Sequence, residues 1–160
     1  MMAPTITTVR EYGASIADAV CRDKIYRLES ALKKMPQVDC PVRNIFAAGL
    51  YAREMTLPAG TVITGAVHKT EHITVLSKGR VQLVRPDGMQ EYAAPCTFIS
   101  PPGMKNAVHV IEDTVWTTFH PNPDDEQSID VLVERYTTSK NADLLGNRQL
   151  AHESTKLEGE

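Results

Sequence analysis

The chain has 160 residues, of which 42% are hydrophobic and 23% charged, and its formal net charge is −3. These values predict one soluble globular domain with its own core. The negative charge argues against a sequence-independent nucleic-acid binder, which is normally basic. No apolar run approaches the roughly 20 residues that span a bilayer. We therefore expect neither nucleic acid nor a membrane as a partner.

The three cysteines, Cys21, Cys40 and Cys96, are odd in number and show no Cys-x-x-Cys spacing. This pattern argues against a disulfide framework and against a thiolate zinc site. The N-terminus lacks the basic flank and apolar run of a secretion signal. We expect the protein in a reducing cytoplasm.

The first 44 residues predict an N-terminal segment with an amphipathic helix. Ser15 is suited to cap the helix, and Pro36 ends it. Steps of four and three residues separate the apolar positions, which are Cys21, Ile25, Leu28, Leu32 and Met35. One narrow apolar stripe of this kind predicts a helix packed on the domain or on a second copy of it. A dedicated partner-binding helix is the alternative.

After Pro41 the pattern changes to β, and residues 45–121 predict a barrel. Ser77-Lys78-Gly79 is typical of a hairpin turn between two strands. Short strands are expected at 50–57, 61–67, 73–76, 80–84, 89–93, 97–100, 107–111 and 115–120. About eight short strands with Gly/Pro turns indicate an all-β sandwich or barrel.

Residues 122–160 predict a short C-terminal helix and a polar tail. Ile129, Leu132, Val133 and Tyr136 recur at helical spacing within 128–136. We expect a weak helix near 144–150, and disorder over the last eight residues.

Two histidines stand out between the β-rich segments. His68 and His72 lie four residues apart, between the turn that contains Gly60 and the one that ends at Gly79. This spacing can place both imidazoles in the mouth of a small β-barrel, a geometry from which many metal sites are built.

The segment resembles the first motif of the cupin superfamily, which runs glycine, five residues, His-x-His, three or four residues, glutamate, six residues, glycine. Anchored on Gly79, the glutamate slot falls on His72 and the second histidine slot on His68, while the first falls on Ala66. The second motif of the family contains Pro-x-Gly followed by a histidine slot. Pro101-Pro102-Gly103 matches it, and the slot falls on Asn106.

The resemblance implies a cupin-type double-stranded β-helix barrel that pairs through its outer strands into a homodimer. More narrowly, the chain is similar to small cupins of tailed phages and prophages, so a phage-encoded protein in a bacterial host is expected. Of the four metal-ligand slots one is kept, one is changed to another ligand type, and two are lost.

The candidate metal ligands are His68, His72 and, as a third, His120. Strand alternation puts His120 on the same face as Trp116 and Thr118. Neutral imidazoles favour one divalent transition ion such as Zn, Ni or Fe. A metal-free polar pocket without any cofactor is the equal alternative.

Further side chains predict ligand contacts. Tyr51 and Arg53 can bind an anionic ligand, although a surface salt bridge is the commoner role of such an arginine. Trp116 is either a core residue or a ligand platform. Lys105 is expected as a solvated lysine near the barrel mouth, and Asn106 as a residue that caps the 101–103 turn.

Three functions remain open from the sequence. The first is a non-catalytic cupin whose pocket binds a small, in particular anionic, molecule as a phage accessory protein. The second is a divalent-metal-dependent isomerase or oxygenase. The third is a purely structural or assembly protein. The sequence alone does not decide whether the chain is an enzyme.

Overall fold

The computed structural model describes residues 16–150, with side chains from residue 19 onward. Two helices, one 3₁₀ turn and eight strands follow each other along the chain. In order they are α2 (Ile16–Leu32), β1 (Cys40–Ala47), β2 (Gly49–Leu57), β3 (Val62–Thr64), β4 (His72–Arg85), β5 (Gly88–Ala93), β6 (Cys96–Ser100), β7 (Ala107–Asn122), α3 (Ile129–Tyr136), η1 (Asn141–Asp143) and β8 (Asn147–Gln149). The predicted all-β fold with flanking helices is confirmed.

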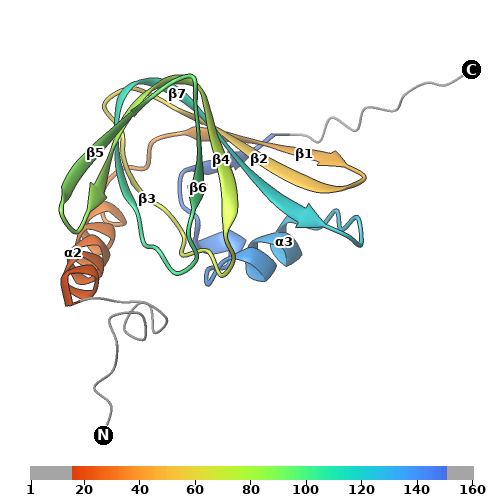
Figure 1. The fold of residues 1–160 in the computed structure, drawn as a ribbon, viewed down its shortest axis with the longest axis horizontal. Helices are drawn as coiled ribbons and strands as arrows, with labels where there is room; N and C mark the ends of the chain where they lie inside the picture. The colour runs from red at the N-terminus through yellow and green to blue at the C-terminus, as the bar shows by residue number, and fades with distance from the viewer. Residues whose placement is uncertain (1–15, 151–160) are drawn as a thin grey trace, which may run out of the picture.

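All eight strands belong to one curled sheet, in the order β5-β4-β7-β2-β1-β8, with β3 beside β7 and β6 beside β4. Figure 1 shows this sheet bending over itself, with α2, which contacts β3, at one side and α3 at the other. The long strands β4 and β7 pair with each other along most of their length and change their other neighbours on the way. This exchange lets one sheet form both walls of the barrel.

The predicted hairpin at Ser77-Lys78-Gly79 is wrong, because β4 runs through these residues as one strand. The pairing with β7 shifts register on either side of Lys78. Gly79 has a φ of 89°, and a Cβ placed there would lie 2.4 Å from the Asp113 carbonyl oxygen. The glycine therefore marks a bulge where two backbones approach closely, rather than a chain reversal. The strands expected at 107–111 and 115–120 are likewise one strand, β7.

The sheet extends beyond the predicted range of 45–121. β1 begins at Cys40, and β8 pairs with it in parallel. The weak helix expected near 144–150 is wrong, because the backbone there bonds to β1, with Cys40 N–H donating to the Gly146 carbonyl at 2.8 Å. An ion pair between Arg148 and Asp39 at 3.0 Å holds the segment. The tail expected to be disordered lies outside the described residues.

Both predicted helices are present. In α2, Ile25 is buried and Leu28 and Leu32 are half-buried, while Met35 lies beyond the helix end and is 57% exposed. The expected cap at Ser15 lies outside the described residues. In α3 the Ser128 hydroxyl accepts a hydrogen bond from the N–H of Val131. No helix in the described part of the chain is long and apolar enough to cross a membrane.

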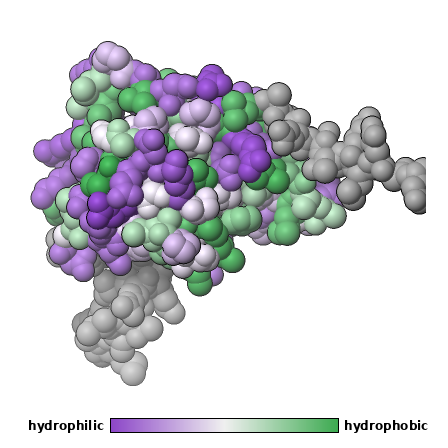
Figure 2. Space-filling model, turned by 90° about the horizontal axis from the view of Figure 1, so that it is seen from above, coloured by the Kyte–Doolittle hydropathy of each residue, from purple (hydrophilic) through white to green (hydrophobic). Residues whose placement is uncertain are grey.

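The core lies inside the curl of the sheet. Its buried members are Cys40, Leu57, Leu76, Val81, Leu83, Val108 and Val110. Trp116 and Phe98 pack against this cluster, with their rings edge to face at 5.8 Å. The face shown in Figure 2 is covered largely by hydrophilic side chains, with hydrophobic ones in smaller groups between them.

The close approach at Gly79 gives a stability prediction. Gly60 has a similar φ of 82°, but no atom lies within 4 Å of a Cβ added there. We expect Gly60→Ala to lower the free energy of unfolding by about 1 kcal/mol through backbone strain alone. We expect Gly79→Ala to cost about 3 kcal/mol or more, because backbone strain and steric overlap combine. Urea denaturation of both variants measures the difference, and equal losses would contradict the bulge assignment.

Candidate functional site

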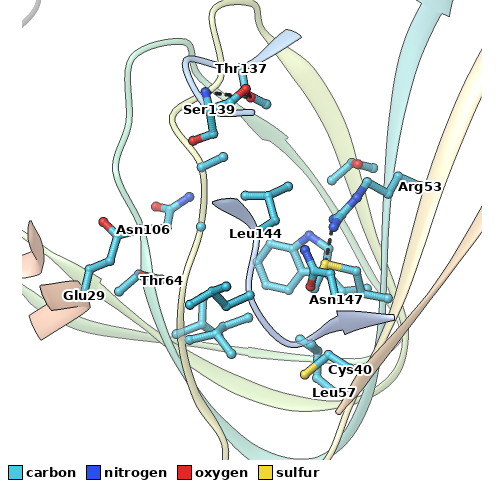
Figure 3. A pocket seen from close by; sticks show the side chains of 18 of the residues that line it. Glu29, Cys40, Arg53, Leu57, Thr64, Asn106, Thr137, Ser139, Leu144 and Asn147 are labelled. Carbon is cyan, nitrogen blue, oxygen red and sulfur yellow. Dashed lines mark hydrogen bonds between the residues drawn. The ribbon is translucent and has the colours of Figure 1, made fainter. Parts of the chain in front are cut away.

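A cavity of about 460 Å³ lies inside the curled sheet. Its wall comes from the inner faces of the strands, from the end of α2 and from the segment that follows α3. The apolar part of this wall includes Met55, Leu57, Ile63, Val108, Trp116 and Leu144. Figure 3 shows Leu144 and Leu57 within this space, with Arg53 on one side and Asn106 on the other.

Three imidazoles meet at the cavity wall. His72 opens β4, His120 lies near the end of β7, and His68 belongs to the loop between β3 and β4. The ring centroids of His68 and His72 are 4.1 Å apart, those of His72 and His120 are 5.0 Å apart, and those of His68 and His120 are 5.5 Å apart. Tyr136 of α3 stacks on His120 at 4.7 Å. The sequence did not single out Tyr136 for this site, since its helical spacing indicates only packing.

The loop that carries His68 is fixed by backbone hydrogen bonds. The carbonyl of His68 accepts from the N–H of Gly103 at 2.8 Å, and the N–H of Lys69 donates to the carbonyl of Tyr136 at 2.8 Å. His68 also forms an isolated β-bridge with Thr137. The Pro-Pro-Gly turn and the end of α3 thus position the imidazole together.

The histidines are held neutral by their surroundings. Burial, which is the largest cause, acts with the neighbouring imidazoles and Arg53 to lower the pKa of His68 to about 4 and that of His120 to about 3. Burial also lowers the pKa of His72, whose Nδ1 lies 3.4 Å from the carbonyl oxygen of Thr70. Neutral imidazoles offer both donors and acceptors to a ligand.

Arg53 is the cation of this site. It lies on β2 opposite Thr118 of β7, and its guanidinium faces the cavity, as Figure 3 shows. Its Nη1 donates to the thioether sulfur of Met55 at 2.7 Å. No carboxylate oxygen of the described residues lies within 4.0 Å of it, in contrast to Arg43 on the neighbouring strand, which pairs with Glu54 at 3.0 Å.

The electrostatic environment of Arg53 agrees with this geometry. Burial lowers the pKa of Arg53, and the groups that favour its charged form are the phenol of Tyr51 and the thiol of Cys40. Both are neutral at pH 7, since burial raises the pKa of Tyr51 to about 12 and also raises that of Cys40. The guanidinium therefore has no anionic partner of its own.

Two polar atoms at the cavity wall are buried without a hydrogen-bond partner among the described residues. They are Nδ1 of His120 and Oδ1 of Asn106. The predicted capping role of Asn106 is wrong, since its side-chain oxygen accepts no hydrogen bond there. Nε2 of His120 lies 3.2 Å from the hydroxyl of Thr118. Most buried polar atoms in proteins are paired, so both side chains have hydrogen-bonding capacity that the protein itself leaves unused.

The other predicted residues have mixed positions. Tyr51 is buried, and its hydroxyl donates to Oδ1 of Asn44 at 2.7 Å, so this group is already used within the protein. Trp116 lines the cavity and packs on the core at once. Lys105 is buried rather than solvated, and its Nζ contacts Glu29 at 2.8 Å and the carbonyl of Gly65 at 2.8 Å.

The arrangement of the rings bears on the predicted metal site. A metal ion binds an imidazole nitrogen in the plane of the ring. The rings of His68 and His120 lie within 5° of parallel, with their centroids 5.5 Å apart. Within the described part of the chain no group of three or more His, Cys, Asp or Glu side chains is arranged to hold a metal ion. The metal site at His68, His72 and His120 therefore stays a prediction.

Comparison with known proteins gives likenesses of fold. No model of a known protein family matches the chain, and no curated protein matches it. Similar solved structures include a cupin domain from Bordetella pertussis Tohama I, with 16% identity and a TM-score of 0.43 over 55% of this chain and 98% of that one.

A cupin-2 domain containing protein from Shewanella frigidimarina has 11% identity and a TM-score of 0.44 over 59% of this chain and 92% of that one. An RmlC-like cupin protein from Desulfovibrio desulfuricans has 15% identity and a TM-score of 0.41 over 52% and 83%. At these identities and TM-scores the chain is similar to cupin domains in fold alone, and nothing about its activity follows from the comparison.

The neutral histidines predict acid sensitivity. An unfolded histidine has a pKa near 6.5, so the unfolded chain takes up protons before the cavity does. We expect the free energy of unfolding to fall as the pH drops from about 6.5 to about 4, and further toward pH 3. In the double variant His68→Gln/His120→Gln this slope becomes shallower, while His109→Gln, a change outside the cavity, retains it. Urea titrations at several pH values measure the slope, and an unchanged slope in the double variant would contradict the assignment.

Proposed function

We propose that this protein is a small cupin whose barrel cavity binds a small anionic ligand, without catalysis of its own. The observation that carries the proposal is Arg53, a guanidinium that faces the cavity without a carboxylate partner among the described residues. A charge removed from water is costly unless it is paired. A ligand carboxylate or phosphate supplies the missing partner through two parallel N–H···O bonds.

The histidines support the binding of an anion at Arg53, because they add hydrogen-bond donors and no further charge. Since His68, His72 and His120 are neutral at pH 7, they offer N–H donors next to Arg53 without adding positive charge. The loss of the family ligand slots at Ala66 and Asn106 also favours a non-catalytic pocket. The proposal includes a cytoplasmic accessory role in a phage or prophage, which rests on the sequence resemblance alone.

A metal-dependent isomerase or oxygenase is the second candidate, and it rests on the 4.1 Å approach of His68 and His72. With Nδ1 of His72 next to the Thr70 carbonyl, Nε2 is left as an acceptor. Two imidazoles bind an ion weakly, and within the described residues no group of three or more His, Cys, Asp or Glu side chains is arranged around an ion. A purely structural protein, the third candidate, leaves the position of Arg53 without a reason.

A homodimer is part of the proposal, and an apolar row on the outside of the sheet supports it. Ile73 of β4 is the cross-strand neighbour of both Ile99 of β6 and Phe119 of β7. These three side chains are 49%, 63% and 39% exposed. The adjacent Thr74 is buried, so the row lies on the outer face. A second copy that presents the same row would cover it by two-fold symmetry.

Replacement of Arg53 tests the ligand site. In Arg53→Met we expect the free protein to be at least as stable as the parent, because an unpaired, half-buried charge is removed. We expect benzoate and phosphate to raise the melting temperature of the parent with increasing concentration. We expect this rise to vanish in Arg53→Met and to persist in Arg43→Met, which removes a surface pair worth about 0.5 kcal/mol.

Thermal unfolding of the parent and of both variants with each anion measures this rise in melting temperature. A rise retained in Arg53→Met would contradict the proposal. One equivalent of zinc, nickel or iron that is bound by the parent and lost in His68→Ala/His72→Ala would favour the metal-dependent candidate instead.

Charge in the apolar row tests the homodimer. Ile73→Lys places a cation at the centre of the row and should convert a dimer into a monomer. Met89→Lys is a matched control, because Met89 is 59% exposed on β5, outside the row. Sedimentation equilibrium measures the mass of each. A monomeric parent protein, or a dimeric Ile73→Lys, would show that this face does not join two copies.

A further inference from the structure

We infer that the ligand is a monocarboxylate with an apolar body and a hydroxyl group at its far end. This inference rests on the proposed function and names the chemical class of its ligand. It follows from three properties of the cavity, which are one cation on one side, an apolar wall in the middle, and an unpaired carboxamide on the other side.

The charged side favours a monoanion. Among the described groups, Arg53 is the cation at this part of the wall, and the imidazoles beside it are neutral. The carboxylates that line the cavity belong to Glu29 and Asp143. Figure 3 shows Glu29 on the side away from Arg53, where it pairs with Lys105. One guanidinium balances one carboxylate, whereas a phosphate dianion would leave a second charge without a counter-ion.

The middle of the cavity is suited to an apolar group. Leu57, Val108, Trp116 and Leu144 contribute to its wall, and Figure 3 shows Leu144 between Asn106 and Arg53. The volume of about 460 Å³ falls within the roughly 300–1,000 Å³ of pockets that take drug-sized ligands. An inorganic ion or acetate at Arg53 would leave this wall without contacts. A ring or branched chain attached to the carboxylate fills it.

The far side offers an unpaired carboxamide. Oδ1 of Asn106 is buried without a partner, Nδ2 makes no hydrogen bond within the described residues, and Figure 3 places Asn106 across the cavity from Arg53. The backbone carbonyl of Asn106 accepts from Gly65 N–H at 3.0 Å, which fixes the residue in place. The adjacent Lys105 does not pair with this carboxamide, because its Nζ contacts Glu29 and the Gly65 carbonyl. Since Oδ1 is shielded from the cavity, the Nδ2 amide is the group that a ligand hydroxyl oxygen can reach, and Nδ2 donates the hydrogen bond.

The test uses matched carboxylates of increasing length. Benzoate, phenylacetate and 3-phenylpropanoate are each compared with the analogue that carries a 4-hydroxyl group, and acetate is the minimal anion. Calorimetric titration measures the affinity of each for the parent, for Asn106→Leu and for Arg53→Met. Asn106→Ala is the second variant should Asn106→Leu not fold. Unchanged binding of the non-hydroxylated acids shows that the cavity of the Asn106 variant is intact.

We expect the best aryl carboxylate to bind the parent at least tenfold more tightly than acetate. At least one hydroxylated acid should bind about tenfold more tightly than its partner, which corresponds to one satisfied hydrogen bond. This preference should disappear in Asn106→Leu, and every acid should lose affinity in Arg53→Met. The free Asn106→Leu protein should be no less stable than the parent, because an unpaired polar atom is removed.

Two results would overturn the inference while the proposed function stands. In one, acetate binds as tightly as the aryl acids. In the other, the hydroxyl preference survives in Asn106→Leu. If acetate, phosphate and all aryl acids fail to bind the parent, the proposed function fails as well, and this outcome is distinct from the other two.

Discussion

The candidate site depends on the position of β7 between β4 and β2. Pairing with β4 sets Ile73 against Phe119, so the neighbouring inward side chains His72 and His120 lie next to each other. Pairing with β2 sets Thr118 against Arg53. One central strand therefore brings an imidazole, a hydroxyl and a guanidinium from three strands onto one concave wall. The bulge at Gly79 allows β4 to follow β7 around the curl instead of turning back.

The chemistry of the cavity follows from how charge is distributed in it. Three clustered imidazoles in a partly dry site avoid mutual repulsion by staying neutral, which their lowered pKa values express. Arg53 cannot escape in this way, because a guanidinium stays protonated even when burial lowers its pKa. The site therefore holds one fixed positive charge among neutral donors and acceptors. Such a site selects an anion by charge and positions it by hydrogen bonds.

The sequence predicted what depends on local pattern and failed where distant segments decide. The spacing of His68 and His72 correctly placed both at one cavity, because only a short loop segment separates His68 from the start of β4 at His72. The Lys78-Gly79 pair is typical of a turn, and only the approach of β7 makes it a bulge. The strand at 147–149 has no strong β pattern and forms because β1 offers a free edge. The missing partner of Arg53 could not be predicted, since it depends on every side chain that surrounds the cavity.

The most direct test of the account is the position of a carboxylate in a crystal of the protein grown with 3-(4-hydroxyphenyl)propanoate. We expect the carboxylate within about 3 Å of the Arg53 guanidinium. The ring should lie against Trp116 and Leu144, with the hydroxyl directed at Asn106. An acid bound outside the barrel, or bound inside it with the carboxylate turned away from Arg53, would contradict the account.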